Sequence, residues 1–274
     1  MSAQGGLRTH QPMPIKIATW NVNSLRARWP LVSEWLAREE PDVLCVQETK
    51  VRDEEFPVQA LADLGYRVAF AGEPAYNGVA VIARGDLAAV EVGLSGFDDP
   101  QKRLIAVTCA GLRIISCYVP NGTAVDSPRY DYKLQWLAAL RAHLERELIR
   151  HPRLVVAGDF NIAPTDQDVH DPQAWEGQIL VSDRERAAFR DLLETGFYDA
   201  FARCGADVCG FSWWDYRGMA FQRNRGLRID HLLISHALGE SCRACHVDRA
   251  PRAQTRPSDH APVWLELDER ARGT

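Results

Sequence analysis

The sequence predicts a mixed α/β fold in which β-sheets pack face to face and helices lie on their outer faces. Short runs of β-branched and other apolar residues recur along almost the whole chain. Only three segments have the apolar spacing of a long amphipathic helix, and the two kinds of segment do not alternate in the regular order of a parallel βαβ protein. Without a Pro-, Gly- or Ser-rich linker in its middle, the 274-residue chain is expected to form one domain.

Nine apolar runs of five to eight residues predict the strands. Each run is rich in Val, Ile, Leu or aromatic residues and is bounded by polar or turn-forming residues. In chain order the runs are 15–20, 42–47, 66–71, 78–83, 103–110, 112–119, 153–159, 229–235 and 263–267.

Three amphipathic segments predict the helices. The first two, 25–36 and 130–148, carry apolar residues at steps of three and four, so that these residues share one face of a helix. The third begins with a capping box formed by Ser182 and Glu185 and ends at Gly196. Few long helices beside many strands agree with sheets at the centre of the fold.

The composition is that of an ordinary globular protein. The chain has 32 Lys and Arg against 37 Asp and Glu, and this net charge of −5 argues against a histone-like coat of positive charge but not against a local basic cleft. The longest apolar stretch, 104–112, is far shorter than the roughly 18 residues of a membrane helix. Residues 1–13 lack the apolar core of a signal peptide. We therefore expect a cytoplasmic protein without membrane attachment, with a disordered leader over 1–13, a single domain over 14–268 and a tail over 269–274.

Seven cysteines, an odd number, in a chain without an export signal favour reduced thiols. Segment 242–246, Cys-Arg-Ala-Cys-His, has the spacing of a c-type haem attachment site, and with Cys204 and Cys209 it could form a four-ligand zinc site. Haem attachment normally needs export, however, and a spacing of five between Cys204 and Cys209 is loose for zinc. We expect unligated thiols.

Polar residues gather at one end of six of the predicted strands. A single cluster of this kind is typical of a turn, because Asn, Asp and Gly favour turns for local reasons. Six clusters rich in carboxylates, amides, His and Tyr instead indicate a site, since rigid strands commonly carry functional residues on their terminal loops. A site requires these strand ends to converge. The clusters are 20–23, 47–50, 118–122, 158–161, 228–230 and 258–260.

The residue types in these clusters suit the hydrolysis of a phosphodiester. Oxygen ligands without a Cys and His set favour Mg²⁺ or Mn²⁺ over zinc. Several carboxylates in one cleft also need a cation or a protonated His to neutralise them. Asp and Glu can bind the metal and activate water, whereas Asn, His, Tyr and Arg can stabilise the charge that develops on the phosphate.

At these residues the chain resembles the exonuclease III family, the bacterial abasic-site endonucleases and 3′-exonucleases of the endonuclease/exonuclease/phosphatase superfamily. The resemblance runs from 15 to 267. GDFN and SDHAP are typical of the whole superfamily, whereas WNVNSLRAR, FSWWDYR and NRGLRID narrow the likeness to its DNA-repair branch. The motifs are TWNVNSLRAR (19–28), QETK (47–50), NGVA (77–80), YVPNG (118–122), GDFNIAPTD (158–166), FSWWDYR (211–217), NRGLRIDHLL (224–233) and PSDHAPV (257–263).

The resemblance implies a fold and an activity. The fold is a four-layer sandwich, in which two packed mixed β-sheets are flanked by helices and the site lies at one end. The activity is metal-dependent hydrolysis that incises duplex DNA 5′ to abasic sites and removes 3′ nucleotides or 3′ blocking groups. The implied cofactor is Mg²⁺ or Mn²⁺. The implied partner is double-stranded DNA with abasic sites, nicks or 3′ ends, and we expect a monomer.

The resemblance also implies roles for a metal shell and a water-activating group. Glu48 matches the principal metal-binding glutamate of the family, and Asn21 and Asp259 lie beside it in the metal shell. Asp159 matches the aspartate that activates water. Asn161 matches the residue that helps to hold the nucleophile or a second ion, so Asp159 and Asn161 are also candidate metal residues.

Three further residues match the phosphate-binding part of the family's site. His260 matches the phosphate-binding histidine, and Asp230 matches the carboxylate that fixes its tautomer and favours its charged form. Tyr118 matches a tyrosine that either donates to the phosphate or acts as a phenolate base. We favour the donor, because a pKa of about 10 is hard to lower next to carboxylates.

The residues expected to face DNA follow from the same resemblance and from charge. Segment 210–260 has eight Lys and Arg against five Asp and Glu, a local charge of +3 that fits a basic rim around an acidic floor. Met219 and Phe221 in this segment are expected as readily in the core as at the DNA. The candidate DNA-binding residues are Arg103, Asn121, Lys133, Trp213, Trp214 and Arg217.

Two other functions remain open on the same scaffold. One is an inositol-phosphate or phospholipid phosphatase, which FSWWDYR, NRGLRID and the lack of an apolar membrane-docking run disfavour. The other is a catalytically silent DNA-binding relative, which the complete set of Glu48, Asp159, Asn161, Asp230 and His260 disfavours.

Overall fold

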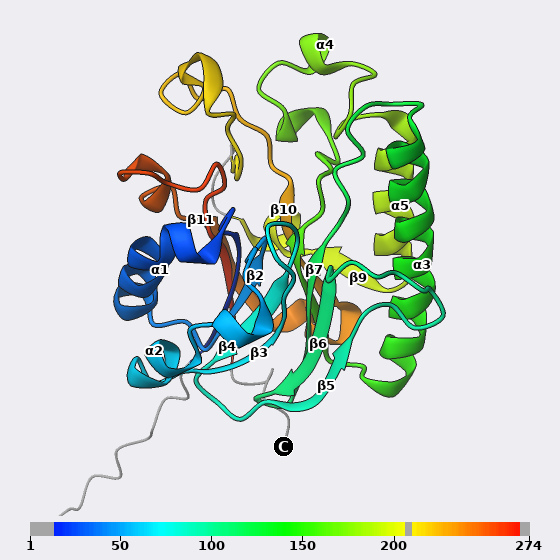
Figure 1. Ribbon diagram of the computed structural model, residues 1–274. Coiled ribbons are helices and arrows are strands. Elements are labelled where there is room, and N and C mark those ends of the chain that lie inside the picture. Colours follow the sequence, from blue (N-terminus) through cyan, green and yellow to red (C-terminus); the bar gives the residue numbers. More distant parts are fainter. Residues whose placement is uncertain (1–13, 206–209, 269–274) are drawn as a thin grey trace, which may run out of the picture.

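Two six-stranded β-sheets pack against each other at the centre of the structure, and helices cover both outer faces (Figure 1). The structure is a computed structural model that describes residues 14–205 and 210–268. Its four layers confirm the sandwich that the sequence predicts. The expected leader, 1–13, and the expected tail, 269–274, lie outside the described residues.

The first sheet combines strands from both ends of the chain. β1 and β2 run parallel, whereas β12 is antiparallel to β1 and β4 is antiparallel to β2. In spatial order its strands are β11 (Cys242–Val247), β12 (Val263–Leu267), β1 (Ile15–Asn21), β2 (Val43–Gln47), β4 (Val79–Ala83) and β3 (Arg67–Ala71).

The second sheet comes from the middle of the chain. β7 and β8 run parallel, and β10 is antiparallel to β8. In spatial order its strands are β5 (Ala88–Val92), β6 (Leu104–Cys109), β7 (Leu112–Tyr118), β8 (Leu154–Asp159), β10 (Asp230–Ser235) and β9 (Phe197–Asp199).

Apolar side chains on both faces of the central strands hold the layers together. Ile17 of β1 packs between the two sheets, whereas Ala18 and Trp20 pack toward the helices on the outer face. Successive residues of a strand point to opposite faces, so a strand buried on both faces reads as a continuous apolar run. The predicted strands read this way for that reason.

Helices cover each sheet on its outer side (Figure 1). α1 (Leu25–Glu39) and α2 (Val58–Asp63) pack on the first sheet, and α3 (Pro128–Arg150) and α5 (Asp183–Glu194) pack on the second. Ser182 and Glu185 form the predicted capping box at the start of α5. Two short helices, α4 (Pro172–Trp175) and α6 (Ala200–Cys204), lie in the connections. No helix among the described residues is long and apolar enough to cross a membrane.

The nine predicted strands and three predicted helices are all present, and short elements were missed. β5 has no buried residue, because it is the exposed edge of its sheet, so it lacks an apolar run. β9 has only three residues. β11 contains the Cys-Arg-Ala-Cys-His segment, which is therefore a strand and not a haem attachment loop.

The expectation of unligated thiols is wrong for one pair of cysteines. Cys204 at the end of α6 and Cys242 at the start of β11 form a disulfide, because a β-bridge between Gly205 and Cys245 brings the two segments together. This bond also removes both cysteines from the zinc set that the sequence left open. Cys209 lies outside the described residues. The free cysteines of the described chain, at positions 45, 109, 117 and 245, are buried.

Candidate active site

All six polar clusters meet at one end of the sandwich. β1 and β2 end side by side, with Asn21 opposite Gln47, and β7 and β8 end with Tyr118 opposite Asp159. Because β10 runs antiparallel to β8, the first residue of β10, Asp230, lies opposite Asp159. The cluster 258–260 precedes β12, which is antiparallel to β1, and so reaches the same end. The convergence that a site requires is therefore present.

His260 lies between two buried carboxylates. Its Nδ1 is 2.8 Å from Asp230 Oδ2, and its Nε2 is 3.7 Å from Asp159 Oδ2. Ser212 Oγ donates to the same Asp230 oxygen at 2.6 Å. Burial alone would lower the pKa of His260, but the charges of Asp230 and Asp159 outweigh it and raise the pKa to about 10. The ring therefore carries a proton on both nitrogens at neutral pH.

Asp159 accepts two hydrogen bonds that fix its carboxylate. Asn21 Nδ2 donates to Oδ2 at 2.9 Å, and the backbone N–H of Asn161 donates to Oδ1 at 2.9 Å. Complete burial raises the pKa of Asp159 to about 7, with His260 opposing the shift and Asp230 adding to it. A carboxylate whose pKa lies near neutral is well matched to accept a proton from water.

Glu48 lies beside Asp159 on the other side of Asn21. Asn21 Nδ2 donates to Glu48 Oε1 at 2.8 Å, and Lys50 Nζ is 2.7 Å from Oε2. Burial acts to raise the pKa of Glu48, but Lys50 and Asn21 hold the pKa below its usual value. One amide thus bridges two carboxylates, which places their oxygens close together.

Asp259 joins this group through Asn23. Asn23 Nδ2 donates to Asp259 Oδ1 at 3.0 Å, and Lys50 Nζ donates to Asn23 Oδ1 at 2.7 Å. Trp213 Nε1 donates to the second Asp259 oxygen at 3.1 Å. Asn23 and Lys50 were not singled out from the sequence, although both lie inside clusters that were.

The charges of this group suit a divalent cation. Glu48, Asp159, Asp230 and Asp259 are four carboxylates, and the cations paired with them among the described residues are Lys50 and His260. The carboxylates outnumber the cations paired with them, and oxygen donors are the ligands that Mg²⁺ and Mn²⁺ prefer. Ligand atoms of Asp159, Asp230 and His260 also lie within 4.8 Å of one another. A protonated ring is not a metal ligand, however, so the oxygens around Glu48 fit the ion better.

Tyr118 keeps the proton on its phenol group at neutral pH. Burial raises its pKa well above the ordinary value, and the charges of Glu48 and Asp159 raise it further. The guanidinium of Arg103 lies 4.7 Å from the centre of the Tyr118 ring, and its Nη1 donates to the Tyr118 carbonyl at 3.2 Å. A phenol in these surroundings can donate a hydrogen bond but is a poor base.

Asn121 and Asn161 are hydrogen-bonded to each other. Asn121 Nδ2 donates to Asn161 Oδ1 at 2.9 Å, and Asn161 Nδ2 donates to the Val119 carbonyl at 3.0 Å. Both ends of the Asn161 amide are therefore occupied. Asn161 also has a left-handed backbone, with φ of 51°, which is uncommon for a residue with a side chain.

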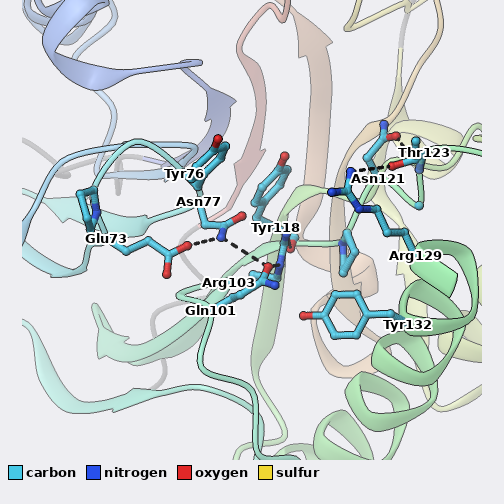
Figure 2. A pocket seen from close by; sticks show the side chains of 13 residues that line it. Glu73, Tyr76, Asn77, Gln101, Arg103, Tyr118, Asn121, Thr123, Arg129 and Tyr132 are labelled. Atoms are coloured by element: carbon cyan, nitrogen blue, oxygen red, sulfur yellow. Dashed lines mark hydrogen bonds between the residues drawn. The ribbon is translucent and has the colours of Figure 1, made fainter.

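A cavity of about 570 Å³ opens next to Tyr118. Figure 2 shows Tyr118 between a wall that carries Tyr76 and Asn77 and a wall that carries Arg129 and Tyr132. Tyr76 is 72% exposed. Tyr76 directly precedes the NGVA run at 77–80, and Arg129 lies at the start of α3; neither was among the candidate DNA-binding residues.

Two of the predicted DNA-binding residues are buried, which is a correction. Trp214 is fully buried against Phe221, and its Nε1 donates to Asn224 Oδ1 at 3.3 Å, so it cannot reach a phosphate. Lys133 is also fully buried and pairs with Glu185. Its position gives the signal that was missed, because it continues the apolar stripe of α3 three residues after Tyr130 and four before Leu137.

The remaining predicted DNA-binding residues reach solvent to different extents. Arg217 is exposed on the loop beside the site and is paired with Asp215 through two nitrogens. Trp213 is half-buried because its ring packs against an apolar cluster that includes Leu227, and its Nε1 donates to Asp259. Asn121 is exposed and Arg103 half-buried at the cavity next to Tyr118. Met219 is 58% exposed at the tip of the same loop as Arg217, whereas Phe221 packs on Trp214.

Comparison with known proteins identifies similar sequences and structures. Residues 18–260 match the model of the Endonuclease/Exonuclease/phosphatase family. Exodeoxyribonuclease III of Haemophilus influenzae is 34% identical over 266 residues, which cover 92% of this chain and 100% of that protein.

Two solved structures share the fold over nearly their whole length. A 3′ phosphatase, NExo, from Neisseria, bound to a product DNA hairpin, is 45% identical with a TM-score of 0.91, and the match covers 93% of this chain and 99% of that one. An AP endonuclease from Archaeoglobus fulgidus is 37% identical with a TM-score of 0.88, covering 93% and 99%.

Proposed function

Since this chain belongs to the endonuclease/exonuclease/phosphatase family and is a DNA-repair nuclease like exodeoxyribonuclease III, we propose that it hydrolyses DNA phosphodiesters at the site built around Asp159 and His260. It incises duplex DNA 5′ to abasic sites and removes 3′ nucleotides or 3′ blocking groups. The observation that carries this proposal is the convergence of Glu48, Asp159, Tyr118 and the His260–Asp230 pair at one end of the sandwich.

The side chains divide the chemistry among them. Asp159 accepts the proton of the attacking water, since its two hydrogen bonds aim it and its pKa lies near neutral. His260 donates from Nε2 to an oxygen of the phosphate, and Asp230 keeps that ring charged. Tyr118 donates its phenol proton to a second oxygen of the phosphate.

Glu48, Asn21 and Asp259 would hold the metal ion, with Asp159 and Asn161 as further candidates. When bound, Mg²⁺ or Mn²⁺ would supply positive charge to the phosphate and to the leaving oxygen. The excess of carboxylates over paired cations supports this assignment.

DNA is held through its backbone. Arg103, Asn121, Trp213 and Arg217 remain the proposed contacts, and the cavity next to Tyr118 adds Arg129 to them. Such contacts position the duplex without reading bases. We also propose that the enzyme works as a cytoplasmic monomer at the nucleoid, where it meets abasic sites, nicks and 3′ ends.

One experiment tests the function against the alternatives. The protein is incubated with a duplex carrying a stable abasic analogue, a nicked duplex with a 3′-phosphate, an intact duplex and inositol phosphates, each with Mg²⁺, Mn²⁺ or EDTA. We expect incision that leaves 3′-hydroxyl and 5′-sugar-phosphate ends, and release of the 3′-phosphate, only with metal. An Asp159→Asn preparation controls for contaminating nucleases. Phosphate release from inositol phosphates without cleavage of DNA would instead assign the phosphatase function.

A further inference from the structure

Lys133 is a fully buried ammonium whose three N–H groups all have partners. Nζ donates to the carbonyl oxygen of Asn161 at 2.7 Å, to the carbonyl oxygen of Asn121 at 3.2 Å, and to the carboxylate of Glu185. Burial lowers the pKa of Lys133, whereas Glu185 acts to raise it. No donor of this side chain is left over for a phosphate.

Two of these partners lie on the loops that carry the site. Asn121 follows β7 and Asn161 follows β8, and the side chains of these two residues are hydrogen-bonded to each other. Asn161 is held from both sides, because its N–H donates to Asp159 Oδ1 and its carbonyl accepts from Lys133. Lys133, Asn161 and Asp159 thus form a series of hydrogen bonds that ends at the proposed base.

The third partner anchors the series to a helix. Glu185 accepts from the backbone N–H groups of Leu180 and Ser182, both at 3.1 Å, and from Ser182 Oγ at 2.5 Å. The stem of Lys133 is also confined, since a Cβ on Gly122 would lie 3.1 Å from Lys133 Cδ. The ammonium has little freedom to move.

We propose that Lys133 is a positioning residue, which fixes the loops of Asn121 and Asn161 and thereby the direction in which Asp159 presents its carboxylate. This inference rests on the role of Asp159 given under the proposed function. A buried ion pair is often no more stabilising than apolar residues of the same volume, so stability alone does not account for a charge at this place. Removal of Lys133, by contrast, would leave the buried Asn161 carbonyl without its donor, and the loops of Asn121 and Asn161 would then shift to find other partners.

The test replaces both charges at once and compares the result with a matched pair elsewhere. The variant Lys133→Met with Glu185→Gln removes the donors without leaving a lone buried charge. The control is Arg113→Met with Glu147→Gln, because Arg113 and Glu147 also form a fully buried ion pair and Arg113 also donates to a main-chain carbonyl, that of Ala89. That pair lies at the opposite end of β7 from Tyr118.

Two measurements separate positioning from stability. We expect kcat on the abasic duplex to fall by about 30-fold in the Lys133 variant, with KM within about twofold of the wild type, because a small misplacement of a reacting group costs up to about 100-fold. Amide hydrogen exchange at Asn161 should become about tenfold faster in the same variant, since the Asn161 carbonyl loses its donor and the loop that holds the Asn161 N–H against Asp159 opens more often. We expect the melting temperature to fall to a similar extent in the Lys133 variant and in the control variant. In the control variant, however, kcat and the Asn161 exchange rate stay unchanged.

The outcomes are decisive in each direction. Rescue of most of kcat by Lys133→Arg, which keeps the charge and several donors, supports positioning. A kcat within about twofold of the wild type in the Lys133 variant, or an equal loss of kcat in the control, overturns it. Should the Met variant fail to fold, Lys133→Gln with Glu185→Gln makes the same comparison with a shorter amide. A wild-type protein that cleaves no DNA would refute the proposed function, whereas the exchange measurement still reports on the link between Lys133 and Asn161.

Discussion

Asp159 and His260 share the proton chemistry of the site because their surroundings set their pKa values apart. Burial raises the pKa of Asp159 to about 7, and the carboxylates around His260 raise its pKa to about 10. Between these values Asp159 has lost its proton and His260 has kept one, which is the combination that a base and a phosphate-binding donor need.

The pH dependence of kcat/KM follows from this pair. Activity should rise through a pKa of about 7 as Asp159 becomes a carboxylate, and fall above about 10 as His260 loses its proton. Asp230→Asn removes the charge that holds the proton on His260, so the alkaline limb should move to lower pH while the acid limb moves less. Rate profiles of both proteins check this, and an alkaline limb that is the same in both would contradict the role of Asp230.

Asp159→Asn tests the base directly. The amide keeps the size of the side chain but accepts no proton, so we expect folding and DNA binding to be retained and several kcal/mol of transition-state stabilisation to be lost. Melting temperature, DNA affinity and single-turnover rate are the measurements. Near wild-type turnover would make Tyr118 the better candidate for the base.

Glu48→Ala tests the metal shell. Because Glu48 is the carboxylate nearest the amide of Asn21 and the ammonium of Lys50, its loss should raise the concentration of Mg²⁺ needed for half-maximal activity rather than abolish cleavage at saturating metal. A metal titration of the rate measures this shift. If the Mg²⁺ concentration for half-maximal activity is unchanged and only the maximal rate falls, the ion does not bind at Glu48.

At the scale of elements, a buried charge network supports the strand that carries Asp230. Arg228, two residues before it, donates to Asp168 at 2.6 Å and to Asp199 at 2.7 Å. Asp199 also caps α6 by accepting from the N–H of Phe201 at 3.0 Å. The guanidinium of Arg228 holds the pKa of Asp199 well below its usual range, against the opposing effect of burial.

Asp199→Asn should destabilise the protein at neutral pH by about 3 to 5 kcal/mol, because it leaves Arg228 with one fewer buried counter-charge. The pKa of Asp199 is lower in the folded than in the unfolded protein, so its stabilisation is present above the unfolded value of about 4 and is lost as the pH falls below it. Urea unfolding between neutral and acidic pH should therefore show a weaker acid dependence in the variant. Parallel curves for both proteins would contradict this.

The same scale shows what the sequence could predict. Central strands buried on both faces can be recognised in the sequence as apolar runs. The edge strand β5 is exposed at every position, and β9 has only three residues, so neither shows such a pattern. Lys133 shows a different limit. A lysine on an amphipathic helix is normally at the surface, so the place of Lys133 on the apolar stripe of α3 was outweighed by its residue type, and its partner Glu185 on α5 is far away in the sequence.

At the scale of the whole molecule, the sandwich gathers residues from both sheets at one end. Asn21 and Glu48 come from the first sheet and Tyr118 and Asp159 from the second, so no local segment contains the site. Their chemistry could be predicted because each cluster lies at the end of a strand. Which of the basic residues face outward could not be predicted, because that depends on how the loops and helix starts fold over the rim.

The salt dependence of DNA binding tests whether basic residues around the site contact phosphates of the DNA backbone. With about four phosphate contacts, the slope of log affinity against log salt should be about −3 to −4, although the net charge is −5. Arg103→Ala should flatten the slope by about one, while Lys133→Met with Glu185→Gln should leave it unchanged because Lys133 is buried. Titrations in an Asp159→Asn background measure binding without cleavage. Identical slopes for Arg103→Ala and its parent would remove Arg103 from the DNA contacts.

The disulfide between Cys204 and Cys242 closes a ring of chain that contains both the exposed loop at Arg217 and the buried Asp230. A protease that cuts the chain once, after Arg217, would open this ring, but the disulfide would still join the two fragments. The nicked protein would migrate as one band on a non-reducing gel and as two after reduction. Its two pieces would also stay tethered at a high effective concentration, so a single cut at the loop would leave the enzyme one molecule.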